Sequence, residues 1–151
     1  MFNRSGISSF NTNLPGLENG KQMFCECAQL VSVNSKMPKL KDGSNMFANC
    51  KNLKSFSADL SSLENGLLMF SRCGDLSFRS PLPKLINGTG MFNGCKLDME
   101  SLRIIAESLP ETVTRSDGQG VISLGTVNNT DEAIKLIKLM RSKGWKVMYH
   151  R

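Results

Sequence analysis

A motif that recurs every 22 or 23 residues constrains the fold of this chain more than any other feature. Its template is Leu-x-(Asn or Asp)-Gly-x-x-Met-Phe-x-x-Cys, and the four copies begin at Leu17, Leu40, Leu63 and Leu85. A unit this short cannot bury its own apolar face, so successive units must stack on one another around a continuous core. The sequence therefore predicts an α/β repeat solenoid.

The shared positions of the motif are expected to form an inward-facing ladder along the solenoid. Met and Phe supply apolar fill, and a buried free Cys behaves as a small hydrophobe. Spacings of 23, 23 and 22 between the cysteines match neither a paired zinc-ligand pattern nor a disulfide framework, so reactive or metal-binding thiols are the lesser alternative. The predicted ladder residues are Met23, Phe24, Cys27, Met46, Phe47, Cys50, Met69, Phe70, Cys73, Met91, Phe92 and Cys95.

Each Asn-Gly or Asp-Gly pair in the motif predicts a tight turn, because glycine accepts a positive φ. The four glycines of these pairs are Gly20, Gly43, Gly66 and Gly88.

The motif resembles the BspA-like leucine-rich repeats of bacterial surface proteins and phage-encoded proteins. The resemblance spans residues 17–96 and extends more weakly to residues 1–16, where Met1-Phe2 and Ser5 stand at the Met-Phe and Cys positions. In that family a short strand follows the Cys-x-x-Leu segment, and the strands stack into a parallel sheet. The resemblance implies a short leucine-rich-repeat array and a role in adhesion, in a virion, or in recognition of a host macromolecule.

Strand alternation sorts the residues that follow each ladder Cys into inward and outward positions. If Val33, Phe56 and Phe78 point inward, their neighbours form an outward face of mostly small, uncharged side chains. Single-stranded nucleic acid stacks its bases on aromatic rings, which this face lacks, so nucleic acid is not the expected partner. A protein or glycan partner and a merely solvated face remain open. The candidate binding residues are Ser32, Asn34, Ser55, Ser57, Ser77 and Arg79.

The repeat decays after Cys95, and residues 98–151 predict a helix–strand–helix–strand cap that belongs to the same domain as repeats 1–97. Asp98 stands in an N-cap position before the first helix, and Thr130 or Asp131 before the second. A cap of this kind closes the open end of a repeat array. The ending at Lys143–Trp145 resembles that of short phage-encoded relatives.

The second predicted helix has an apolar and a basic side. Ala133, Ile134, Ile137 and Met140 are expected to be buried. The opposite side carries Lys135, Lys138 and Arg141, which form a candidate basic cap for an acidic partner or phosphate. The alternative is an ordinary solvated face of an amphipathic helix.

Several function classes lack support in the sequence. The chain has no G-x-x-x-x-G-K-[ST] or G-x-S-x-G motif and a single histidine, His150, so we expect a non-enzyme without cofactor or metal. It has no run of about 20 apolar residues and no visible export signal, so we expect no membrane span. Nineteen basic against thirteen acidic residues give a net charge of +6, which attracts anionic partners.

The expected function is a non-enzymatic binding or structural module, an adhesin-like or virion-associated component that recognises a protein or glycan. The alternative is a small phage-encoded inhibitor of a host enzyme or defence complex. The expected location is a phage virion or the bacterial cytoplasm, or the cell surface if the chain is part of a longer protein.

Overall fold

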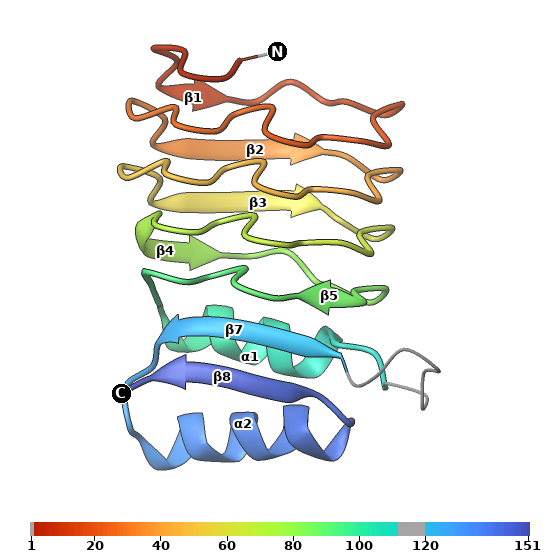
Figure 1. Cartoon of the computed structure of the whole chain (residues 1–151), viewed down its shortest axis with the longest axis vertical. Helices are drawn as coiled ribbons and strands as arrows, with labels where there is room; N and C mark the ends of the chain where they lie inside the picture. Colours follow the sequence, from red (N-terminus) through yellow and green to blue (C-terminus); the bar gives the residue numbers. More distant parts are fainter. Residues whose placement is uncertain (1, 112–119) are drawn as a thin grey trace.

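The computed structural model describes residues 2–111 and 120–151, and within them the chain adopts an α/β fold with a parallel sheet of eight strands and two helices (Figure 1). The predicted α/β class and the parallel strands are therefore confirmed. The strands are β1 (Ser9–Phe10), β2 (Ser32–Lys36), β3 (Ser55–Asp59), β4 (Gly74–Phe78), β5 (Asn87–Gly88), β6 (Cys95–Leu97), β7 (Val121–Thr126) and β8 (Lys146–His150), and the helices are α1 (Met99–Ser108) and α2 (Asp131–Ser142).

Each repeat forms one coil, and the coils stack along the long axis of the molecule (Figure 1). In β1 to β4, each residue pairs with the residue one repeat away, so that Ser32 faces Ser55 and Ser55 faces Ser77. A second line of parallel bridges joins the Asn or Asp of each turn, from Asn19 to Asn87. The two lines of backbone hydrogen bonds fix the vertical register of the coils.

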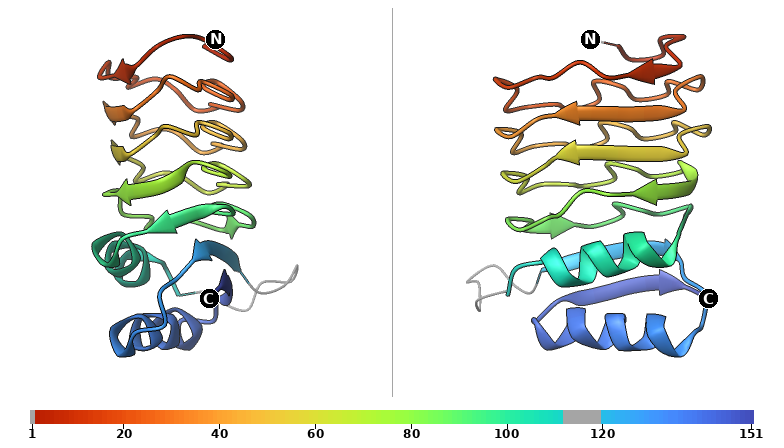
Figure 2. Two further views of the ribbon diagram at one scale, coloured as in Figure 1. Left: turned by 90° about the vertical axis from the view of Figure 1, so that its left-hand side faces the viewer. Right: turned by 180° about the vertical axis from the view of Figure 1, so that it is seen from behind.

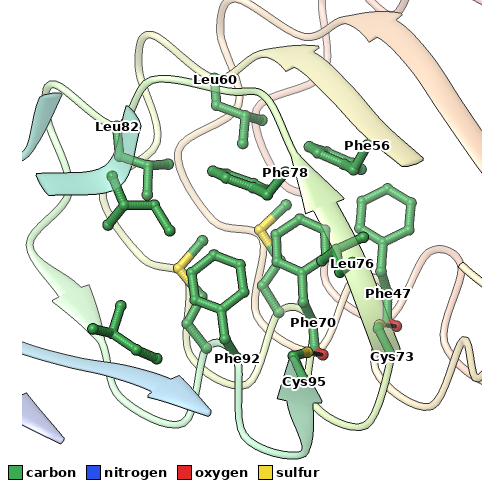
Figure 3. Close-up of a cluster of buried hydrophobic side chains, with 14 of the residues drawn as sticks. Phe47, Phe56, Leu60, Phe70, Cys73, Leu76, Phe78, Leu82, Phe92 and Cys95 are labelled. Carbon is green, nitrogen blue, oxygen red and sulfur yellow. Dashed lines mark hydrogen bonds between the residues drawn. The ribbon is translucent and has the colours of Figure 1, made fainter. Parts of the chain in front are cut away.

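Stacked phenylalanine rings fill the interior of the coils (Figure 3). The motif phenylalanines form one column in which Phe47, Phe70 and Phe92 lie 5.5 Å apart, with neighbouring rings nearly parallel. A second column, from Phe56 to Phe78, meets the first edge-on. The ladder residues are buried as predicted except Met23, which lies in the second coil and is only partly covered.

The four ladder cysteines are free and buried, as predicted, and each thiol also donates a hydrogen bond to the coil before it. The Cys73 Sγ lies 3.1 Å from the Phe47 carbonyl oxygen, and the Cys95 Sγ lies 2.9 Å from that of Phe70. Burial raises the pKa of the Cys50 thiol to about 12. Each of these carbonyl oxygens also accepts a backbone N–H of its own coil, as Phe47 does from Cys50 at 3.2 Å, so the thiol is a second donor to it. The cysteines therefore combine apolar filling with a hydrogen bond between coils.

The prediction of positive φ at the motif glycines is wrong, since none of Gly20, Gly43, Gly66 and Gly88 adopts it among the described residues. These glycines instead make room for the next coil, because a Cβ on Gly43 would lie 2.8 Å from the Met69 sulfur. Positive φ occurs at two other positions of each coil, occupied by Gln22, Asn45, Leu68 and Gly90, and by Arg4, Glu26, Asn49, Arg72 and Gly94.

The chain changes its architecture at β6, where α1 takes the place that a strand would occupy in the next coil (Figure 2). Two serine hydroxyls of α1 accept the backbone N–H groups left open by the last repeat: Ser101 from Phe78 at 2.8 Å, and Ser108 from Leu82 at 2.9 Å. β7 continues the opposite side of the array, where it pairs with β5 and β8. Helices thus replace the strands on one side, and strands replace the turns on the other.

The ends of the cap helices agree with the predictions. Asp98 caps α1, and Thr130 caps α2. The ammonium group of Lys143 lies 2.8 to 2.9 Å from three carbonyl oxygens at the end of α1, where it compensates the C-terminal helix dipole. The prediction for Ile134 is wrong: this side chain is 36% exposed, and Leu136 takes its place on the buried side of α2.

Candidate functional site

The outward side of β2 and β3 carries four small polar side chains in two columns, which we call the strand face: Ser32, Asn34, Ser55 and Ser57. All are exposed except Ser32, which is half-buried. None of their side-chain polar groups has a hydrogen-bond partner within residues 2–111 and 120–151. The backbone beneath them is held in the parallel ladder, so these groups are presented on a rigid surface and are free to bind.

Ser77 and Arg79, the other two candidates on this side, are occupied by contacts within the chain. The Arg79 guanidinium donates to both carboxylate oxygens of Asp98, at 2.8 and 2.9 Å. The Ser77 hydroxyl donates to the same carboxylate at 2.7 Å. The strand face therefore ends at a clamp between β4 and the start of α1.

The electrostatics of this clamp favour an ionised Asp98. The Arg79 guanidinium, and then the hydroxyl groups of Ser101 and Ser77, hold the pKa of the Asp98 carboxyl well below its usual range. The same pairing raises the pKa of Arg79. Because Asp98 also caps α1, the clamp joins the last repeat to the cap and is structural in its geometry.

A groove of about 560 Å³ lies at the foot of the strand face, and we call it the junction groove. It opens where β6 stops after three residues and the chain turns into α1. Leu97 and Met99 are half-buried on its wall, and Lys54, Asp75 and Lys96 are exposed at its rim. Ser77 also lines the groove, so it is continuous with the strand face.

The basic cap residues Lys135, Lys138 and Arg141 are all exposed on α2. No ion pair joins any of them to a carboxylate in the part of the chain that the structure describes. Residues 133–151 contain six basic residues and no acidic one, so this segment carries a net positive charge. α1 lies between α2 and the strands of the repeats, so the basic cap and the strand face are separate surfaces (Figure 2).

Sequence reasoning named Ser77 as a candidate but missed the junction groove that it lines. A signal for the groove exists, because the fourth motif copy lacks the x-x-Leu that follows Cys27, Cys50 and Cys73. In this shorter copy, β6 ends after three residues, and α1 only partly fills the space next to β4.

Two chemical possibilities find no support in the described residues. No group of three or more His, Cys, Asp or Glu side chains is placed to hold a metal ion there. Neither α1 nor α2, the helices of those residues, has the length and apolar content needed to cross a bilayer.

A comparison of the chain with protein-family models, with curated proteins and with solved structures finds no match.

Proposed function

We propose that this chain is a leucine-rich-repeat solenoid of the BspA-like type and acts as a non-enzymatic recognition module. Its strand face binds a macromolecular partner, a protein or a glycan, in an adhesin-like or virion-associated setting. The periodic motif and the one-coil-per-repeat pairing support the family proposal. The absence of a catalytic motif supports a binding role.

The observation that carries this proposal is the set of free polar groups on the strand face. Small side chains on a parallel ladder lose little conformational entropy when they bind, because the backbone beneath them is already fixed. Adjacent parallel strands repeat every 4.7–4.9 Å or so. A partner that follows this ladder meets the same polar pattern on successive coils.

The test compares the wild type with a double variant that carries Ser55→Trp and Ser57→Trp. Each protein serves as bait in affinity capture from bacterial lysate and surface extract, and mass spectrometry identifies the captured proteins. The matched control is Ser61→Trp, an exposed serine of the same coil just beyond β3. We expect a partner that binds the wild type and the control but is lost with the double variant. A partner retained by all three baits would exclude the strand face as its contact.

The positive charge of residues 133–151 favours a second candidate, in which the chain is a small phage-encoded inhibitor and the basic cap contacts an acidic surface of a host enzyme or defence complex. Reversal of charge at Lys135, Lys138 and Arg141 tests it. We expect such a complex to be lost with the triple glutamate variant and kept with the strand-face variant. Unchanged binding by the triple glutamate variant would exclude the basic cap as the contact surface.

A setting in a phage particle has its own test. Mass spectrometry of purified virions from the producing phage should detect the chain if it is virion-associated. Its detection in host cytosol alone would reject that setting and leave the inhibitor candidate.

A further inference from the structure

We infer that the junction groove is the anchor point for a protein partner, and that it receives an apolar side chain carried next to a carboxylate. This inference rests on the proposed recognition function, and it chooses a protein over a glycan as the partner. It draws on the lining of the groove, on the charges at its rim and on its continuity with the strand face.

The groove has an apolar interior that is partly open. Leu76, Leu102 and Val127 lie beneath and are almost fully buried, whereas Leu97 and Met99 are only half-covered. A side chain that enters would bury the exposed parts of Leu97 and Met99, and the flexible thioether of Met99 can adapt to its shape. The volume of about 560 Å³ lies within the usual range of ligand pockets.

The charges at the rim favour an acidic neighbour. Lys54 and Lys96 are exposed, and neither forms an ion pair within residues 2–111 and 120–151. Asp75 is the opposing charge at the rim, because the carboxylate of Asp98 is already held by Arg79. The two lysines therefore leave an excess positive charge beside the apolar opening.

The same lining argues against a sugar as the occupant. Polar or charged residues make up six of the eleven that line the groove, and five are apolar. A glycan hydroxyl group placed against the five apolar side chains would lose water without gaining a partner there, and this costs free energy. A protein side chain of Leu, Ile, Met or Phe matches this surface, because its burial removes apolar area from water without leaving a polar group unpaired.

The groove also lies where a partner on the strand face would reach it. Ser77 lines the groove and pairs in register with Ser55 of the strand face. A segment that extends along the outward side of β2 and β3 can therefore place its next side chain in the groove.

The experiment selects peptides from a random dodecapeptide library displayed on phage, with the full chain as the target. The selected peptides are then measured against three variants. Leu97→Glu places a negative charge in the groove, Lys54→Glu with Lys96→Glu reverses the rim, and Ile86→Glu is the control. Ile86 is 36% exposed and does not line the groove.

We expect the enriched peptides to share an apolar residue adjacent to Asp or Glu. Their affinity should fall by about tenfold or more with Leu97→Glu and by roughly threefold to tenfold with the rim variant, and it should be unchanged with Ile86→Glu. With 13C-methyl-labelled methionine, the NMR signal of Met99 should shift when peptide is added. The signal of the exposed Met148 should not.

Three results would overturn the inference. They are the absence of any enriched peptide, enriched peptides that bind Leu97→Glu as well as the wild type, and a methyl shift at Met148 in place of Met99. If Ser55→Trp with Ser57→Trp abolishes binding while Leu97→Glu does not, the groove inference fails and strand-face recognition stands. If a partner found by affinity capture binds the strand-face variant and the groove variant as well as it binds the wild type, the proposed function fails too.

Discussion

The repeats and the cap enclose one continuous core but hold it by different means. In residues 2–97, the same side chain recurs at the same position of each coil, and every column repeats one contact, such as Phe on Phe or thiol on carbonyl. In residues 98–151, the core is held by individual contacts that do not repeat along the chain. Ser101 and Ser108 of α1 accept the N–H groups that a further strand would have bonded.

This difference indicates which parts of such a chain can form a binding site. A regular stack leaves a flat face, because each coil repeats the one before it. The junction with the cap breaks the regularity, and the break produces both the Arg79–Asp98 clamp and the junction groove. The strand face supplies a rigid polar surface, and the junction supplies a concave, partly apolar groove that adjoins it.

The largest expected effect comes from the middle of the phenylalanine column. Phe70→Ala removes a fully buried ring that stacks on Phe47 and Phe92, and we expect a loss of about 4 kcal/mol in the free energy of unfolding. Phe2→Ala, at the exposed end of the same column, should cost only about 1 kcal/mol. Urea unfolding followed by circular dichroism measures both. Equal losses would contradict the stacked column.

A single glycine should matter almost as much in the cap. Gly125 has a φ of +70°, and a Cβ there would overlap the carbonyl oxygens of Phe92 and Cys95. We expect Gly125→Ala to lower the free energy of unfolding by about 3 kcal/mol. The control is Gly6→Ala, which has open space around it and should change stability by less than about 0.5 kcal/mol. Thermal unfolding of the two variants would compare them, and a tolerated Gly125→Ala would show that β7 does not approach the Phe92 and Cys95 backbone this closely.

The clamp at the junction predicts a pH dependence. The pKa of Asp98 is lower in the folded chain than in the unfolded chain, so its carboxylate stabilises the fold above a pH of about 4 and loses this effect as the pH falls further. Asp98→Asn keeps an N-cap residue but lacks the charge. Allowing for solvent screening of a side chain that is 40% exposed, we expect the variant to be about 1 kcal/mol less stable than the wild type at pH 7.

The stability difference between wild type and Asp98→Asn should shrink as the pH is lowered from about 4 to about 2. Urea titrations over this range measure it. A difference that stays constant with pH would mean that the Asp98 charge does not stabilise the folded junction.

The smallest effect concerns the left-handed positions of the coils. Arg72 has a φ of +61°, and the equivalent position of the next coil is Gly94, with a φ of +71°. We expect Arg72→Gly to raise the free energy of unfolding by about 0.5 kcal/mol, because glycine adopts this conformation without steric cost. Lys51→Gly, an exposed control in the neighbouring turn, should lower it by about 0.5 kcal/mol. A loss in both variants would contradict the assigned backbone conformation.

The repeat itself could be predicted from the sequence because its period forces the stacking. Once the coils are placed one per repeat, the burial of Cys50 and Cys73 follows from their repeated place in the motif. The outward position of Ser55 and Ser57 follows from strand alternation. The cap helices could be placed from their N-cap residues and apolar spacing for the same reason: the signals are local in the chain.

The features that sequence reasoning missed depend on contacts between distant residues. Gly43 is needed because Met69 of the next coil packs against it, and this contact is visible only after the coils are stacked. Arg79 was expected to be a free side chain, but the fold places Asp98, 19 residues further along the chain, within hydrogen-bond distance of it. The junction groove opens where the shorter fourth motif copy ends and α1 begins. Each of these features depends on how one part of the chain packs against a distant part, and a local sequence pattern carries no information about that packing.

The most direct test of the account is a thiol-labelling experiment on the native chain, because the stacked coils bury the cysteines at positions 27, 50, 73 and 95. Each cysteine is followed by mass spectrometry before and after denaturation. We predict that Cys25, which is half-buried, reacts in the native state, and that Cys27, Cys50, Cys73 and Cys95 react only after unfolding. Rapid native labelling of Cys50 and Cys73 would contradict the stacked coils and, with them, the strand face and the junction groove.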